Sequence, residues 1–265
     1  MDFSQRPEGA PRDFPSLLRS QGWLPSVPPA VQRTAAAPVE VQATTILAFK
    51  FRDGVLVAGD RRATAGNIVM YDRADKVLEI DRASVMAIAG SPATAWEMAR
   101  ILEHSFQFYR RSQLQEMSVE GKVRALSKLL RENLGMVMQG VGVVVPLFAT
   151  YDSGSADPAK VYFYDAMGAQ FEAADYASSG SGSPAVRSVL YYQNRWGSKR
   201  VRELDEESSI RLALQALDTA AEADTATGGV DRSGKIYPII KTINEKGITT
   251  VSDSRLSELY QFGNA

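Results

Sequence analysis

The chain has 265 residues, 45% of them apolar, and a formal net charge of −1, which predicts one globular domain with a substantial core. Acidic and basic residues are interspersed, so we expect neither a basic face for nucleic acid nor a polybasic membrane anchor. The absence of cysteine excludes disulfides, thiolate nucleophiles and cysteine-based zinc sites.

The first 43 residues form a proline-rich leader with neither helical nor strand periodicity. Seven of the chain's twelve prolines lie there: Pro7, Pro11, Pro15, Pro25, Pro28, Pro29 and Pro38. Such a leader is either a disordered tail or a propeptide that blocks a nascent N-terminus, and composition alone favours the tail. It lacks the basic start, apolar core and small-residue cleavage site of a secretory signal. We therefore expect a cytoplasmic protein.

Strand-like runs begin directly after this leader. Runs 45–51 and 55–59 flank an Arg-Asp-Gly turn and predict a hairpin. Runs 76–80 and 84–90 predict a second strand pair. The most apolar later run, 136–149, is interrupted by glycine, glutamine and proline, so it does not predict a membrane span.

Two helices are expected after the second strand pair. Ser91-Pro92 supplies an N-cap and a first-turn proline for a helix over 92–115, and a second helix is expected from Ser118 to about Gln139. The only histidine, His104, lies in the first of these helices, so a catalytic triad or a multi-histidine metal site has one imidazole available. We predict no metal ion and no cofactor, and any general base is expected to be a group other than histidine.

The second half of the chain repeats the order of strands and helices. Strands are expected near 147–152, 161–165, 174–177, 236–243 and 248–251. One helix is expected to begin at Ser183-Pro184, another at Asp205 with an acidic first turn that faces the positive end of the helix dipole, and a short one ends the chain. Sheets in the middle with helices outside predict an α+β fold, a four-layer αββα sandwich.

Thr44 would become a self-sufficient nucleophile if the bond after Ala43 were cut. Its new α-amine, with an ordinary pKa of about 7.7–8.0, could act as the general base. A nearby ammonium group would favour the alkoxide-like hydroxyl, and a carboxylate would hold that ammonium in place. Lys76 and Asp60, at two strand ends, are the candidates, although each taken alone is equally typical of a surface ion pair.

Two glycine-containing segments are candidates for the rest of such a site. Gly90 stands between a strand and a capped helix, so its N–H could bind a developing oxyanion, although glycines are common at such junctions. The run Gly180-Ser181-Gly182-Ser183 has neither the G-x-G-x-x-G pattern nor the Gly-Lys-Ser/Thr ending of a phosphate-binding loop. A turn whose hydroxyls brace the site is the better interpretation.

Taken together, these residues resemble a catalytic β subunit of the 20S proteasome, in particular the bacterial, actinobacterial-type branch. The matching segments are Thr44-Thr45-Ile46, 58–64, Asp75-Lys76-Val77, Ala89-Gly90, 180–183 and 224–229. Asp60, Lys76 and Gly90 follow Thr44 by 16, 32 and 46 residues, which also matches the family. The resemblance spans nearly all of 44–257 and implies the N-terminal-nucleophile hydrolase type of αββα sandwich.

The resemblance implies a threonine endopeptidase that matures by self-cleavage between Ala43 and Thr44. Residues 1–43 are then the propeptide and residues 44–265 the catalytic domain. It also implies a role for each matching side chain or backbone group. Thr44 is nucleophile and base, Lys76 tunes it, Asp60 orients Lys76, the Gly90 N–H binds the oxyanion, and Ser181, Asp224 and Thr227 surround the amine and the water that it relays.

Further positions match the family's substrate-binding residues. Arg62, Thr64 and Gly90 correspond to the segment that pairs with an extended substrate by strand addition. The positions that line the pocket for the side chain before the scissile bond are Ala63, Ala74, Leu78, Ile88, Pro92 and Trp96. None of them is charged, so we predict cleavage after apolar residues.

Two residues depart from the family pattern. The residue before the nucleophile is usually glycine, and alanine costs about 1–2 kcal/mol if a left-handed turn is required there. This cost is about tenfold in rate, so Ala43 predicts slower self-cleavage rather than its loss. Pro92 has no N–H and can offer a substrate only its carbonyl.

The resemblance also implies partners. Such subunits form homo-oligomeric β rings stacked with rings of α subunits, and a ring ATPase or another activator delivers unfolded protein. Phe106, Phe108, Tyr109 and Met136, on the two predicted helices, could contact neighbouring subunits, although core packing explains them equally well.

Two other hypotheses stay open. One is an unprocessed, non-catalytic ring subunit of the same fold, which only Ala43 supports. The other is an N-terminal-nucleophile amidohydrolase that acts on a small molecule, which the ring-family motifs disfavour.

Overall fold

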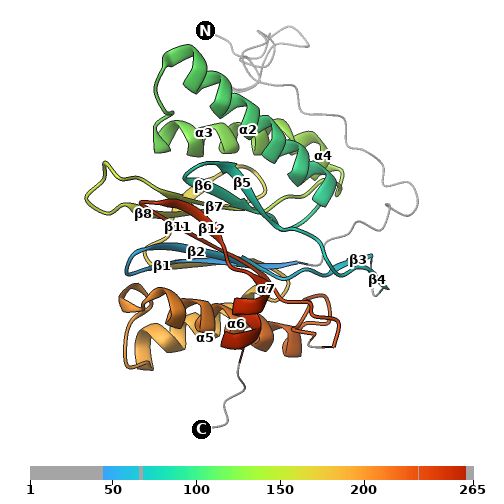
Figure 1. Cartoon of the computed structure of the whole chain (residues 1–265). Coiled ribbons are helices and arrows are strands. Elements are labelled where there is room, and N and C mark those ends of the chain that lie inside the picture. Colours follow the sequence, from blue (N-terminus) through green and yellow to red (C-terminus); the bar gives the residue numbers. More distant parts are fainter. Residues whose placement is uncertain (1–43, 66–67, 232, 261–265) are drawn as a thin grey trace, which may run out of the picture. The chain divides into compact units, whose positions relative to one another are not determined.

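The computed structural model describes residues 44–65, 68–231 and 233–260 (Figure 1). The predicted leader, with Ala43 at its end, lies outside the described residues. Two antiparallel five-stranded sheets and several helices make up the described part. The predicted α+β class is therefore confirmed.

The first sheet is built around the predicted hairpin. Its strands, in spatial order, are β10 (Tyr176–Gly180), β1 (Thr45–Phe51), β2 (Gly54–Gly59), β11 (Ile239–Asn244) and β12 (Gly247–Thr250). Every residue of β1 is buried, because the strand is paired on both edges and covered on both faces. The start of β1, where Thr44 stands, is therefore held rigidly.

The second sheet contains the other predicted strand pair. Its spatial order is β5 (Val77–Asp81), β6 (Ser84–Ala87), β7 (Leu147–Tyr151), β8 (Ala159–Tyr164) and β9 (Gln170–Glu172). A separate two-stranded ribbon consists of β3 (Ala63–Ala65) and β4 (Ile68–Tyr71). The sequence did not predict β3, β4 or β9, because three or four residues are too few to show a period of two.

The helices are divided between the two sheets (Figure 1). One group is α2 (Pro92–Gln113), α3 (Val119–Glu132) and α4 (Leu134–Met138). The other is α5 (Ser183–Trp196), the 3₁₀ helix η1 (Val201–Glu203), α6 (Glu206–Ala223) and α7 (Asp253–Leu259). The predicted helix starts at Pro92 and next to Asp205 are confirmed, and Asp205 accepts a hydrogen bond from the Ser208 N–H at 2.8 Å.

Side chains of β1 show how these elements are layered. Leu47 and Phe49 belong to the core between the first sheet and helices α5, α6 and α7. Ile46 and Ala48, which point to the opposite face, belong to the core between the two sheets. A third core, under α2 and α3, covers the outer face of the second sheet. Each apolar residue of β1 thus contributes to one of two cores.

Several local predictions differ from the structure. The helix expected over 118–139 ends at Glu132, and α4 begins after Asn133, whose side-chain amide donates to the Gly142 carbonyl at 2.6 Å. Phe106 is buried in the core under α2 rather than available to a neighbouring subunit, whereas Phe108 is exposed. The end of the helix and the burial of Phe106 both depend on tertiary contacts, which the periodicity of the sequence does not show.

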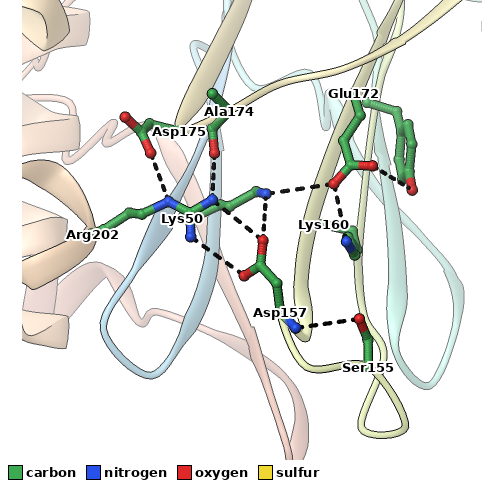
Figure 2. Close-up of polar contacts among 9 residues, drawn as sticks. Lys50, Ser155, Asp157, Lys160, Glu172, Ala174, Asp175 and Arg202 are labelled. Atoms are coloured by element: carbon green, nitrogen blue, oxygen red, sulfur yellow. Dashed lines mark hydrogen bonds and ion pairs between the residues drawn. The ribbon is translucent and has the colours of Figure 1, made fainter.

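An ion-pair cluster anchors β1 near the end opposite Thr44 (Figure 2). Lys50 Nζ is buried and lies 3.2 Å from Asp157 Oδ2 and 3.7 Å from Glu172 Oε1. Arg202 lies 3.4 Å from Asp157 Oδ2 and 2.6 Å from Asp175 Oδ1. Asp157 therefore connects β1 with η1, although the sequence offered no sign of this cluster.

Replacing Asp157 by asparagine is expected to lower Tm at neutral pH and to have little effect in acid. Burial alone would raise the pKa of Asp157, but hydrogen bonds from Arg202 and Lys50 outweigh it and hold this pKa below its usual value. The stability that the carboxylate contributes is present above the unfolded pKa of about 3.9 and is lost as the pH falls through the folded value.

The measurement is the Tm difference between variant and wild type at pH 7 and pH 3. Asp72→Asn is the control, because Asp72 is half exposed and its ion pair with Arg73 is long, at 4.0 Å. A Tm difference for Asp157→Asn that is the same at both pH values would contradict the role of the carboxylate charge.

Candidate active site

Thr44 lies directly before β1 and is buried, with 4% of its surface exposed. Its carbonyl accepts a hydrogen bond from the Ser181 N–H at 3.0 Å, so the start of β1 is tied to the turn after β10. Gly180 has a φ of +93°, and a Cβ placed there would lie 1.8 Å from the Thr44 carbonyl oxygen. Only glycine fits this close approach.

Asp60 follows β2 and is fully buried. Its Oδ1 accepts from the Thr45 N–H at 2.8 Å and from Lys76 Nζ at 2.7 Å. Its Oδ2 accepts from the N–H groups of Arg62 and Gly228, both at 2.9 Å. Four donors on one carboxylate fix its position and orientation.

Lys76 directly precedes β5 and is 3% exposed. Besides Asp60, its ammonium donates to the carbonyl of Arg62. Burial lowers the pKa of Lys76 below the usual lysine value, while the charge and hydrogen bond of Asp60 oppose this shift. The structure thus brings Asp60 and Lys76 together next to the first residue of β1, as the sequence predicted.

A second carboxylate network contains the other predicted polar residues. Ser181 Oγ and Thr227 Oγ1 each donate to Asp224 Oδ2 at 2.6 Å, and the Ala226 N–H donates to Oδ1 at 3.1 Å. Burial alone would raise the pKa of Asp224, but these hydrogen bonds and the charge of Arg62 hold it below the usual value. Asp224 is therefore a carboxylate at neutral pH.

Thr45 joins the two networks and was not singled out by the sequence. Its Oγ1 lies 2.6 Å from Thr227 Oγ1 and accepts from the Gly182 N–H at 3.0 Å. Its backbone N–H donates to Asp60, as described above. The two adjacent hydroxyl residues Thr44-Thr45 were the only available signal, because nothing in the sequence places Gly182 beside β1.

Gly90 has a φ of +106°, and a Cβ placed there would lie 2.0 Å from the Val143 carbonyl oxygen. In its bridge with Val144, the two hydrogen bonds are made by its neighbours, Ser91 N–H to Val143 at 2.7 Å and Val145 N–H to Ala89 at 2.9 Å. Neither of these two hydrogen bonds uses the N–H of Gly90 itself. Gly90 also lines the cavity beside Thr44.

A cavity of ≈ 330 Å³ opens beside Thr44. The residues that line it are Thr44, Ala63, Tyr71, Ala74, Asp75, Lys76, Ile88, Gly90, Pro92, Ala93 and Trp96. They come from the residue before β1, from β3, β4 and α2, and from the segments around β5 and β6, which are separated in sequence but meet here. The cavity therefore places an apolar pocket against Thr44, Lys76 and Gly90.

Most residues predicted for the substrate pocket line this cavity. Leu78 is the exception, because it packs against the core under α2 and α3. Arg62 and Thr64 also lie outside the lining. Arg62 donates to the carbonyls of Thr225 and Thr227 at 2.9 and 3.3 Å. Thr64 pairs with Val69 in the β3–β4 ribbon.

Three lining residues, Tyr71, Asp75 and Ala93, were not predicted. Asp75 adds one acidic group to the lining, and its Oδ1 is engaged by the Val77 N–H at 2.9 Å. Asp75 and Ala93 could have been predicted as lining residues, because they are adjacent in sequence to Lys76 and Pro92. Tyr71 could not, because it reaches the cavity only through the unpredicted ribbon.

Within the described residues, no group of three or more histidine, aspartate and glutamate side chains is arranged to hold a metal ion. No helix in the described part of the chain is long and apolar enough to cross a membrane.

Comparison with known proteins places the chain among the proteasome subunits. The family model described as "Proteasome subunit" matches residues 40–236. Proteins named "Proteasome subunit beta" are similar over most of their length in three actinobacteria: 37% identical in Acidimicrobium ferrooxidans, over 97% of this chain and 90% of the relative; 38% in Streptomyces griseus, over 92% and 82%; and 40% in Streptosporangium roseum, over 88% and 81%. The chain therefore belongs to the proteasome subunit family, a protease family, and within it to the β subunits.

Proposed function

We propose that this β subunit is an active threonine endopeptidase with the αββα sandwich of N-terminal-nucleophile hydrolases. In this proposal, self-cleavage after Ala43 removes residues 1–43 as a propeptide and leaves residues 44–265 as the catalytic domain. The observation that carries the proposal is the Asp60–Lys76 pair, bonded at 2.7 Å next to the head of β1, on a cavity that Thr44, Lys76 and Gly90 share.

The proposed reaction begins when the α-amine of Thr44 takes the proton of its own hydroxyl. Thr44 Oγ1 then attacks the substrate carbonyl, and the oxyanion that forms accepts a hydrogen bond from the Gly90 N–H. The C–N bond breaks as the Thr44 ammonium returns a proton to the leaving amine, which leaves an ester on Oγ1. Water, deprotonated by the same amine, hydrolyses the ester and regenerates Thr44.

Lys76 supplies a positive charge close to the nucleophile. Its buried ammonium favours the developing alkoxide and disfavours a second positive charge on the α-amine, so the amine stays available as a base. Asp60 keeps the ammonium in one position through a bond that its backbone donors make rigid. Ser181, Asp224 and Thr227 are proposed to hold the amine and the water that it activates.

The cavity supports cleavage after apolar residues, because alanine, isoleucine, proline and tryptophan side chains make up most of its lining. Substrate is proposed to bind as an extended strand along the segment that contains Arg62, Thr64 and Gly90. Proteasome subunits assemble into rings. For this chain we propose a β ring stacked with α rings in the cytoplasm, supplied with unfolded protein by a ring ATPase or another activator.

Co-expression with a proteasome α subunit tests the proposal. Intact-mass measurement of the assembled particles is expected to show a chain that begins at Thr44, and the particles are expected to hydrolyse short peptides with an apolar residue before the scissile bond. Assembled particles that keep residues 1–43 and hydrolyse nothing would favour the non-catalytic ring subunit instead.

Replacing Trp96 by alanine is expected to reduce kcat/KM about tenfold for peptides with leucine or phenylalanine before the scissile bond. Trp96 lines the cavity, yet 48% of it is exposed, so its removal takes away an apolar wall without emptying a core. Peptides with alanine at that position should change little, because they do not reach this wall.

Phe108→Ala is the matched control for this prediction. Phe108 is an exposed aromatic residue on the same helix, about 18 Å along its axis from Trp96. Equal losses for large and small apolar residues in Trp96→Ala would show that Trp96 does not select the substrate side chain.

A further inference from the structure

Thr45, the residue after the nucleophile, uses all of its polar groups within the site. Its N–H donates to Asp60 Oδ1 at 2.8 Å, and its carbonyl accepts from the Asp60 N–H at 3.0 Å. Its hydroxyl contacts Thr227 and Gly182. The residue is fully buried, so water cannot replace these partners.

The direction of the hydroxyl chain follows from counting hydrogens. Asp224 is a carboxylate and can only accept, so Thr227 spends its one hydroxyl hydrogen on Asp224 Oδ2. The Thr227 oxygen must then be the acceptor in its 2.6 Å contact with Thr45 Oγ1, and Thr45 is the donor. The Thr45 oxygen accepts from the Gly182 N–H, so one continuous chain runs from Gly182 to Asp224.

The packing at Gly182 leaves no space for a side chain beside the two hydroxyls. A Cβ at Gly182 would lie 2.4 Å from Thr45 Oγ1 and 2.7 Å from Thr227 Oγ1. Glycine is therefore required for the two hydroxyls to meet. Chains of hydrogen bonds that end on a charged group are strengthened by mutual polarisation when they are buried.

We propose that Thr45 is a positioning residue for the nucleophile, acting through the link that its hydroxyl makes between β1 and the Asp224 network. The inference rests on the proposed peptidase function. Once the chain is cut, Thr44 becomes a chain end, and chain ends fray unless they are tied down. Thr45 ties this end to both carboxylates, which keeps the attacking hydroxyl in place for reaction.

Thr45→Val removes the hydroxyl at nearly constant volume and is expected to lower kcat about 10- to 100-fold in processed, assembled particles. KM for a short peptide should change less than about twofold, because the substrate cavity does not include Thr45. Thr45→Ser restores the hydroxyl and should recover most of kcat. Loss of kcat in the serine variant equal to that in the valine variant would overturn the inference.

Thr150→Val is the matched control, because Thr150 is also buried and its hydroxyl donates to the Ala83 carbonyl at 2.9 Å, in the other sheet. It should lower stability without changing kcat. A similar fall of kcat in Thr150→Val would mean that any buried threonine has this effect, and the inference would fail.

A double-mutant cycle separates a shared link from two independent contributions. Thr227→Val breaks the same contact from the other side, so the double variant Thr45→Val/Thr227→Val should be little worse than the poorer single variant. Effects on kcat that multiply would overturn the inference. If Thr45→Val does not assemble, Thr45→Ala replaces it in the cycle and is judged by the same criterion.

Thr44→Ala, measured in parallel, separates failure of the proposed peptidase function from failure of the proposed role of Thr45. If Thr44→Ala still hydrolyses peptides, the proposed function is wrong. If Thr44→Ala is inactive and Thr45→Val keeps the wild-type kcat, the proposed function stands and the role of Thr45 is rejected.

Discussion

Replacing Thr44 by alanine is expected to lower peptide hydrolysis by roughly 10⁴–10⁶-fold, because the variant has no hydroxyl to attack the substrate carbonyl. The same change should leave residues 1–43 attached, since self-cleavage uses the same hydroxyl. Both effects can be measured on one preparation of assembled particles, the first with a fluorogenic apolar-ended peptide and the second by intact mass.

The fold of this variant should be preserved. Hydrogen bonds of the Thr44 carbonyl and of Thr45 hold the start of β1. Alanine at position 44 keeps the same carbonyl and leaves Thr45 unchanged. Thr249→Ala, on an exposed position of β12, is the control for a threonine-to-alanine change and should be processed and active. Hydrolysis at the wild-type rate by Thr44→Ala particles would show that the nucleophile is another residue.

Replacing Lys76 by methionine is expected to lower kcat by roughly 10²–10⁴-fold, because the alkoxide and the neutral amine both lose the charge that favours them. Asp60 would keep three backbone donors, from Thr45, Arg62 and Gly228, so its carboxylate would remain hydrogen-bonded. The variant should therefore assemble, and the loss should appear in kcat more than in KM.

Lys122→Met is a matched control for the loss of a buried lysine. Lys122 is 5% exposed and pairs with Asp81 at 2.7 Å, but this pair joins α3 to the end of β5 and does not include Thr44. This variant should lose thermal stability and keep its kcat when assembled. If both lysine variants lose kcat equally, the charge of Lys76 has no special role.

The pH profile gives a second measurement on the same residue. Burial lowers the pKa of Lys76, so its ammonium deprotonates at a lower pH than that of a free lysine. If the ammonium is required, kcat of the wild type should fall on the alkaline side at a pH below the usual lysine value. Lys76→Arg keeps its charge at every accessible pH and should remove this fall, whatever its absolute rate.

The local pattern of residues was sufficient to predict most of the elements that surround the site, though not β3 and β4. Two apolar, strand-like runs on either side of Asp53-Gly54 predicted the β1–β2 hairpin, and Pro92 and Asp205 marked two helix starts that the structure confirms. These features depend on propensities and hydrogen bonds between residues close in sequence, which a single chain displays directly. The spacing of Thr44, Asp60 and Lys76 added the site, because it matches a family whose members the comparisons also found.

Other features depend on residues that meet only after folding. Phe106 and Phe108 are both aromatic residues of α2, yet one is buried and the other exposed, since only the first faces the second sheet. Leu78 was expected in the pocket and packs in a core, whereas Tyr71 enters the pocket through a ribbon too short to predict. Helical and strand periodicity indicate which residues of an element lie on the same face, but not which other element that face packs against.

The sequence by itself determined the family and most of the secondary structure around the site, and it predicted the reactive groups, because these are properties of short segments and their spacing. Only the tertiary structure decided that Thr45 connects Asp60 with Asp224, that Lys50 meets Asp157, and that segments far apart in the sequence enclose one apolar cavity. The reason is physical: a hydrogen bond or an ion pair between distant residues depends on a separation of about 3 Å, which the packing of the two sheets sets and no local pattern records.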